Sequence, residues 1–294
     1  MRNLVTRRNV MIFGAGAWLA IAGIVPLAAA QTLEEKVSTD GKITIGIYNT
    51  WPWGFTEDGK AKGVGPELLE ASAEALKIKS IDFQVMDFGA LIPSLQSRRI
   101  DIIAGGMYIK AKRCPQVAFS DPIGGPEGNT ALVKTGNPLN IHTYEDMAKN
   151  PNARISNLRS AASTEYLSAA GVPKDRLQQY PDKDAAVAAL LADRIDALVL
   201  DTGTVVGILK DNQISGIERA VPFKENAGGH EIINYNALAF RPEDAAFRDL
   251  FNKRLAELTA DGTVEKIFLK YGYTKDDATP TGAIAKDVCG ADYH

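Results

Sequence analysis

The sequence predicts an α/β protein of two lobes, each built around a mostly parallel sheet. Short apolar runs alternate with amphipathic segments, in the order strand, helix, strand, helix, strand. The pattern of residues 95–106 recurs in residues 190–201: in each copy a helix ends near a basic residue, and Ile-Asp then opens a short apolar run. The alternative is a chance match, since helix-to-strand joints use few residue types. A chain of this length, about 260 residues without its first thirty, usually forms two lobes or domains rather than one core.

Residues 1–30 have the pattern of an export signal. Three arginines and no acidic residue accompany an apolar run over residues 11–25, which ends at Pro26 and is followed by three alanines. We therefore expect cleavage before Gln31. The paired arginines leave both the twin-arginine and the ordinary secretory route open. An uncleaved membrane anchor is the alternative, but the run is rich in glycine and is broken by Pro26.

The charge of the exported part excludes one class of partner. Without the three arginines of residues 1–30, 30 of the 33 basic residues remain against 36 acidic ones, a net charge of −6. Such a surface lacks the basic footprint that nucleic acid or anionic lipid requires, so we expect no nucleic-acid partner. The three histidines show no metal-ligand spacing, so no metal site is expected.

The elements of the first lobe follow in order along the chain. Isoleucines alternate with polar or small residues over residues 43–47, which predicts a strand. Pro66 opens a helix whose apolar residues share one face. Further elements are predicted as a strand over 81–85, a helix over 91–98 and a strand over 100–104.

A second set of elements lies between two apolar strand candidates, residues 131–133 and 237–240. It comprises helices over 144–149, 164–170 and 185–192 and strands over 154–157 and 195–200, and helices over 245–258 and 264–271 come after it. We therefore expect lobe two, residues 135–235, to be inserted into lobe one, residues 31–134 and 236–294. Two crossings would join the lobes.

The stretch after the strand at residues 100–104 indicates a ligand site. Gly105 and Gly106 leave bare backbone N–H groups that a ligand can approach, and Arg113 follows with a planar fork that holds a carboxylate at two points. Gly106 and Asp201 end equivalent strands of the repeat, and open α/β sheets bind ligands at strand ends. The alternatives are a surface or interlobe role for Arg113 and a helix N-cap role for Asp201.

Residues 106–122 carry a motif, Gly-Met-x5-Arg-x5-Phe-Ser-x-Pro. It resembles the signature of bacterial periplasmic solute-binding proteins of the polar amino acid class, solute-binding protein family 3, which deliver ligands to ABC importers. Residues 261–272 resemble the terminal segment of the same family. The resemblance implies a type II periplasmic-binding-protein fold, hinge closure around a small ligand, and an inner-membrane permease as partner. We expect a periplasmic, monomeric protein with no cofactor.

The resemblance also implies roles for individual residues. Arg113 would bind a ligand carboxylate, and Asp201 stands where the family binds an α-ammonium group. Trp53, Phe88 and Tyr108 match positions that line the cleft, although any one of them could instead be a core residue. The second-lobe loop has Ala161, Ala162 and Ser163 where the wider family has Gly-Thr-Thr, which removes the hydroxyl contact or moves it to Ser163.

The aromatic residues sharpen the ligand prediction. Three rings at one cleft suit a delocalised cation, with about 0.5–2 kcal/mol for each ring face. Together with Gly-Gly-Met-Tyr at 105–108, residues 136–140 and 144–146, and a tail cysteine, they resemble the ectoine- and hydroxyectoine-binding subfamily. Ile123 departs from the family, which has tyrosine there. We therefore predict a binding protein for ectoine-type solutes, with a polar or cationic amino acid as the alternative.

An enzyme is a further alternative to a binding protein. It would have the same fold and resemble cyclohexadienyl dehydratases, with Glu165 or Glu127 as an acid in the cleft. We favour binding without catalysis, because Arg113 and the other cleft residues need no catalytic group.

Cys114 and Cys289 are an even pair in an exported protein, which permits a disulfide without requiring one.

Overall fold

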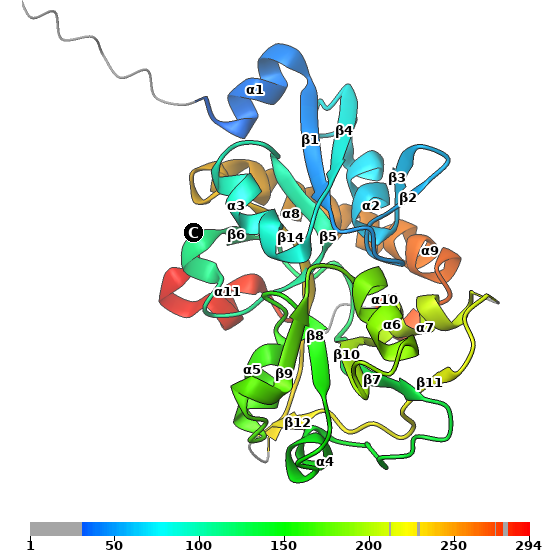
Figure 1. Cartoon of the computed structure of the whole chain (residues 1–294). Helices are drawn as coiled ribbons and strands as arrows, with labels where there is room; N and C mark the ends of the chain where they lie inside the picture. Colours follow the sequence, from blue (N-terminus) through cyan, green and yellow to red (C-terminus); the bar gives the residue numbers. More distant parts are fainter. Residues whose placement is uncertain (1–30, 212, 228–229, 274, 279–281) are drawn as a thin grey trace, which may run out of the picture. The chain divides into compact units, whose positions relative to one another are not determined.

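Two five-stranded mixed sheets organise the computed structural model, which describes residues 31–211, 213–227, 230–273, 275–278 and 282–294 (Figure 1). The expected export signal, residues 1–30, lies outside the described residues. In the described part of the chain, no helix has the length and apolar character needed to span a membrane. The two sheets confirm the predicted α/β class with two lobes.

The sheet of lobe one has four strands that run in one direction and one that runs against them. Its order is β4 (Ser80–Val85), β1 (Lys42–Ile47), β5 (Ile102–Tyr108), β14 (Asn236–Phe240) and β6 (Ala118–Phe119). β1 pairs in parallel with β4 and β5, whereas β14 is antiparallel to β5 and β6. The predicted strands over 43–47, 81–85 and 237–240 are therefore confirmed.

Helices pack around this sheet (Figure 1). The helices of lobe one are α1 (Leu33–Asp40), α2 (Val64–Ser72), α3 (Leu91–Gln96), α8 (Ala245–Ala260), α9 (Thr263–Lys270), α10 (Lys275–Ala278) and α11 (Ala285–Cys289). Short 3-10 helices lie at η1 (Phe88–Ala90), η2 (Cys114–Gln116), η4 (Pro242–Asp244) and η5 (Gly290–Asp292), and a hairpin is formed by β2 (Phe55–Glu57) and β3 (Lys60–Lys62).

The sheet of lobe two has the same plan. Its order is β11 (Ile217–Arg219), β7 (Asn129–Lys134), β10 (Ala197–Asp201), β8 (Ile155–Leu158) and β9 (Leu177–Tyr180). β8 pairs in parallel with β9 and β10, and β7 is antiparallel to β10 and β11. The remaining elements are α4 (Tyr144–Lys149), α5 (Ser163–Ala169), α6 (Lys183–Leu191), α7 (Thr202–Leu209), η3 (Lys174–Arg176), β12 (Asn226–Ala227) and β13 (His230–Glu231).

The sequence repeat corresponds to a structural repeat. Asp101 donates its backbone N–H to Thr44 O at 2.7 Å and accepts from Thr44 N at 2.8 Å, which ties the start of β5 to β1. Asp196 pairs with Arg154 in the same way, at 2.9 and 2.8 Å, which ties the start of β10 to β8. The Ile-Asp step therefore fixes the same strand pairing in both lobes.

One lobe boundary needs correction. We expected residues 129–134 to end lobe one, but β7 pairs with β10 and β11 in the sheet of lobe two. An apolar run does not encode which distant strand it will pair with, so the sequence left its sheet undetermined. The first crossing lies between β6 and β7, and it pairs with the second crossing through a bridge between Glu127 and Asn234.

A disulfide joins Cys114 to Cys289, with their Cα atoms 5.5 Å apart. It links η2 to α11, which are both parts of lobe one. The sequence left this bond open, and the structure forms it. Because neither cysteine belongs to lobe two, the bond leaves the movement between the lobes free.

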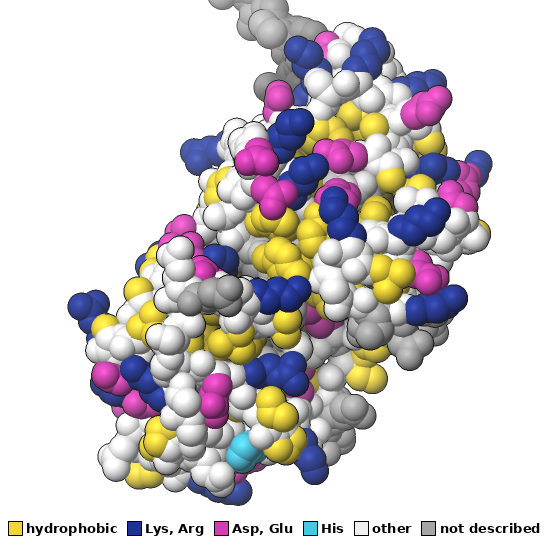
Figure 2. Space-filling model, turned by 90° about the vertical axis from the view of Figure 1, so that its right-hand side faces the viewer, with side chains coloured by type: hydrophobic (Ala, Val, Ile, Leu, Met, Phe, Trp, Pro, Cys, Tyr) yellow, Lys and Arg dark blue, Asp and Glu magenta, His cyan; other side chains and the backbone are white. Residues whose placement is uncertain are grey.

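Surface charge agrees with the composition. On the face seen in Figure 2, basic and acidic side chains are interspersed, and no large patch of one sign covers it. Interspersed charges give no continuous field that would attract a nucleic-acid backbone.

Candidate functional site

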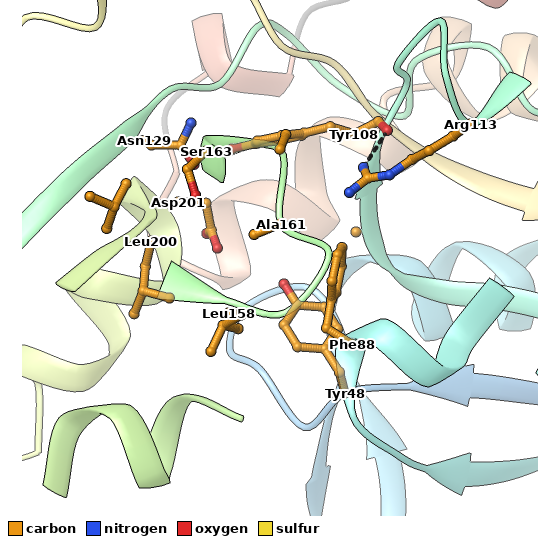
Figure 3. A pocket seen from close by; sticks show the side chains of 13 residues that line it. Tyr48, Phe88, Tyr108, Arg113, Asn129, Leu158, Ala161, Ser163, Leu200 and Asp201 are labelled. Carbon is orange, nitrogen blue, oxygen red and sulfur yellow. Dashed lines mark hydrogen bonds between the residues drawn. The ribbon is translucent and has the colours of Figure 1, made fainter. Parts of the chain in front are cut away.

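A small cavity lies between the lobes at the carboxyl ends of their parallel strands (Figure 3). The empty space in and around it amounts to about 440 Å³. Its lining residues are Tyr48, Phe88, Gly106, Tyr108, Arg113, Asn129, Leu158, Ala161, Ala162, Ser163, Val199, Leu200 and Asp201. The cavity therefore lies at the carboxyl ends of the strands, where open α/β sheets bind ligands.

Seven of the eight predicted site residues line this cavity. They are Phe88, Gly106, Tyr108, Arg113, Ala162, Ser163 and Asp201. Trp53 is the exception, because it lies behind the wall in the core of lobe one and is only 3% exposed. Its ring fills the space beside Gly106, where a Cβ atom would lie 2.4 Å from Trp53 Cγ. Our prediction that Trp53 lines the cleft is therefore wrong for this cavity.

Arg113 both lines the cavity and contacts lobe two. Its Nη1 donates to Tyr108 O at 2.9 Å, and its Nη2 donates to Ser160 O at 2.6 Å across the cleft (Figure 3 shows the first bond). Burial lowers the pKa of its guanidinium to about 10, so the group remains charged at neutral pH. A guanidinium has five N–H groups, so the group can hold these carbonyls and still donate to a ligand. The interlobe role and the ligand role are compatible.

Asp201 likewise serves two purposes. As the N-cap of α7 it accepts from Thr204 N at 2.8 Å and from Thr204 Oγ1 at 2.6 Å. Its Oδ1 also accepts from Trp53 Nε1 at 3.3 Å, so the tryptophan positions this carboxyl group from behind. Burial raises the pKa of the Asp201 carboxyl, and the bonds from Thr204 oppose that rise. The group points into the cavity, where a ligand cation would relieve the cost of burial (Figure 3).

Three aromatic rings belong to the apolar part of the wall, together with aliphatic side chains such as Leu158 and Leu200. Tyr48 and Phe88 meet edge to face with centroids 4.9 Å apart, and Tyr108 lies on β5 opposite them. Burial raises the pKa of both tyrosine hydroxyls, which keeps them neutral. The sequence analysis missed Tyr48, although its position directly after β1 is the strand-end signal that identified Gly106 and Asp201.

The sequence analysis also missed the polar end of the wall in lobe two. Asn129 is the first residue of β7, and because β7 runs antiparallel to β10 it pairs with Asp201. Its Nδ2 and backbone N both donate to Glu225, whose pKa burial raises. No sequence signal places Asn129 here, because its position follows from the unpredicted pairing of β7.

The lobes are closed onto each other around the cavity. Contacts across the cleft join Arg113 to Ser160, Trp53 to Asp201, Lys110 to Tyr166, Lys112 to Glu165 and Glu127 to Gly203. Two glycines of α7 permit the approach: a Cβ on Gly203 would lie 2.4 Å from Tyr273 Oη, and one on Gly207 would lie 2.6 Å from Trp51 Cε3. Larger residues at these positions would hold the lobes apart.

The two acids considered for catalysis lie outside the cavity lining. Glu165 forms an ion pair with Lys112 at the cleft edge. Glu127 is buried behind Tyr108, whose hydroxyl is 3.4 Å from Glu127 Oε2. In the part of the chain that the structure describes, no group of three or more histidine, cysteine, aspartate or glutamate side chains could hold a metal ion.

A two-lobed fold with a cavity between its lobes is typical of a class of binding proteins, and the comparisons agree. Residues 43–274 match the bacterial extracellular solute-binding proteins, family 3. The chain belongs to this family, so it is an extracellular solute-binding protein and not an enzyme.

Individual relatives extend along nearly the whole chain. A probable amino-acid ABC transporter periplasmic-binding protein of Sinorhizobium fredii is 33% identical over 95% of this chain and 92% of its own length. The lysine/arginine/ornithine-binding periplasmic protein of Escherichia coli is 27% identical over 86% and 95%. The crystal structure of EhuB in complex with hydroxyectoine is 29% identical, has a TM-score of 0.79, and covers 88% of this chain and 98% of its own. The fold is thus the type II periplasmic-binding-protein fold.

Proposed function

We propose that this protein captures a compact zwitterionic solute of the ectoine type in the periplasm and presents it to an ABC permease of the inner membrane. The arrangement of Arg113, Asp201 and the three rings between them carries the proposal. A carboxylate would bind to Arg113, and the cationic ring of the ligand would lie against Tyr48, Phe88 and Tyr108. Residues 1–30 would direct export and would then be removed by cleavage before Gln31.

The cavity lining favours an ectoine over an extended amino acid. Three aromatic side chains contribute to it, and a delocalised amidinium stacks well on ring faces, whereas a primary ammonium is strongly hydrated and needs a carboxylate. The likeness to the hydroxyectoine complex supports the same choice.

A polar or cationic amino acid is the second candidate. The observation in its favour is Asp201, because a buried carboxylate is the partner that an α-ammonium group requires. The lysine/arginine/ornithine-binding relative supports this alternative.

A thermal-shift screen of residues 31–294 distinguishes the two. We expect ectoine and hydroxyectoine to give the largest increases in melting temperature, ahead of glycine betaine, arginine, lysine and glutamine. A ligand at about a thousand times its Kd raises the free energy of unfolding by about 4 kcal/mol, which such a screen detects. A larger shift with arginine, lysine or glutamine would favour the amino-acid alternative, and no shift with any of them would reject both.

A further inference from the structure

Glu127 lies on the first crossing between the lobes, and the binding site does not account for it. Its backbone N–H donates to Asn234 O on the second crossing at 2.9 Å, so the residue is fixed at the hinge. Its side chain is buried and is absent from the cavity lining. A buried carboxyl group at a hinge is costly unless the fold uses it.

The carboxyl group of Glu127 contacts both lobes. Its Oε1 accepts from Tyr273 Oη at 3.0 Å and from Gly203 N at 3.3 Å. Its Oε2 accepts from Asn236 Nδ2 at 2.6 Å and from Tyr108 Oη at 3.4 Å. Tyr273, Asn236 and Tyr108 belong to lobe one, whereas Gly203 lies in the first turn of α7 in lobe two. Opening of the lobes would therefore move Gly203 N away from Glu127 Oε1 and expose this side of the carboxyl group to water.

The surroundings of the group disfavour a negative charge. The titratable groups facing it are the Asp201 carboxyl at the end of β10, the Tyr48 hydroxyl after β1, the Tyr108 hydroxyl of β5 and the Tyr273 hydroxyl after α9. Burial first, and then the negative charge of Asp201, raise the pKa of Glu127 well above its ordinary value, while hydrogen bonds from its neighbours oppose the rise.

Asn236 can form a hydrogen bond with Glu127 whether the carboxyl group is ionised or protonated. Its Oδ1 is buried without a hydrogen-bond partner among the residues that the structure describes, although its Nδ2 is 2.6 Å from Glu127 Oε2. Turning the amide would place an acceptor against Oε2, where a protonated carboxyl group donates. The contact can thus serve either protonation state, because an amide carries both a donor and an acceptor.

We propose that Glu127 is a positioning residue that joins the lobes as they close and takes up a proton when they do. The inference rests on hinge closure in the proposed function. Closure then depends on pH in a definite direction. In the open form the pKa of Glu127 lies nearer its ordinary value of about 4.3, and in the closed form it is higher. Between the two values, closure takes up a proton, so ligand affinity falls as pH rises, by up to about tenfold per pH unit.

Calorimetry with ectoine and with L-arginine, in buffer pairs of different ionisation enthalpy, measures the protons taken up on binding. We expect wild type to take up more protons than Glu127→Gln, with a difference approaching about one proton per ligand in the sensitive pH range. Glu225→Gln is the matched control. Glu225 is also a buried acid near a crossing, but its hydrogen-bond partners Asn129 and Tyr144 both lie in lobe two and do not separate on opening. The Lys110 ammonium of lobe one also faces Glu225 and lowers its pKa, so proton uptake by Glu225→Gln should lie nearer to that of wild type than uptake by Glu127→Gln does.

Each outcome is decisive. Equal uptake by wild type and Glu127→Gln, with ligand bound, overturns the inference and leaves the proposed function intact. Failure of wild type to bind either ligand rejects the proposed function and the inference together. If Glu127→Gln does not fold, the wild-type affinity between about pH 5 and pH 8 decides: affinity that rises as pH falls supports proton uptake, and affinity that is constant or falls rejects it.

Discussion

Replacing Arg113 with alanine is expected to weaken ligand binding by about 2–5 kcal/mol, because the ligand carboxylate would be left unpaired in a cleft closed to water. The variant also loses the bond to Ser160 O that spans the cleft. Isothermal calorimetry with the ligand from the screen measures the change. The protein itself should fold, because the partners that Arg113 loses are two backbone carbonyls and no buried acid.

Lys112→Ala is the matched control for this prediction. Lys112 is the neighbouring cation, it also reaches lobe two through Glu165, and its side chain is 61% exposed. An exposed ion pair contributes about 0–1 kcal/mol, so the control should bind nearly as wild type does. An Arg113→Ala affinity within about threefold of wild type, less than 1 kcal/mol, would remove Arg113 from the site.

Asp201→Asn is expected to separate the two classes of ligand. Asparagine caps a helix as well as aspartate does, so α7 should remain intact while the negative charge is lost. Binding of an α-amino acid should weaken by about 2–5 kcal/mol, since its ammonium would be buried without a counter-charge. Ectoine should lose less, because its delocalised charge also interacts with the rings.

The double substitution Tyr108→Ala and Phe88→Ala should reverse this ranking. It removes two of the three ring faces and leaves Asp201 in place. Calorimetry of both ligands with both variants gives the comparison. If Asp201→Asn abolishes ectoine binding and the ring substitutions leave it unchanged, the hypothesis that the aromatic rings bind the ligand cation is wrong.

Local sequence patterns predicted most of the fold. The alternation in β1 and the Ile-Asp step before β5 and β10 are local features, and each one determines its own strand. Arg113 was found because it lies in the family motif that follows a strand. Asp201 was found because it ends a strand, and strand ends meet at the ligand site in this class of fold. The same rule, applied to the residue after β1, identifies Tyr48.

The features that the sequence did not reveal depend on pairing across long distances. β7 joins the sheet of lobe two through β10, more than sixty positions away. Trp53 turns inward because Gly106 leaves space for its ring, and no local pattern shows that fit. Glu127 becomes a joint between the lobes only when α7 and the segment after α9 approach it.

Small-angle scattering in solution, without and with saturating ligand, tests most directly whether the lobes close around a solute. Gly203→Ala is the control, since its added methyl group would collide with Tyr273 and Glu127 in the closed form. We expect this overpacking to make the free energy of lobe closure less favourable by about 1–3 kcal/mol. Alanine favours the helix itself more than glycine does. The radius of gyration of wild type should decrease when ligand binds, and Gly203→Ala should need more ligand for the same decrease. An unchanged wild-type profile with ligand bound would contradict a hinged receptor.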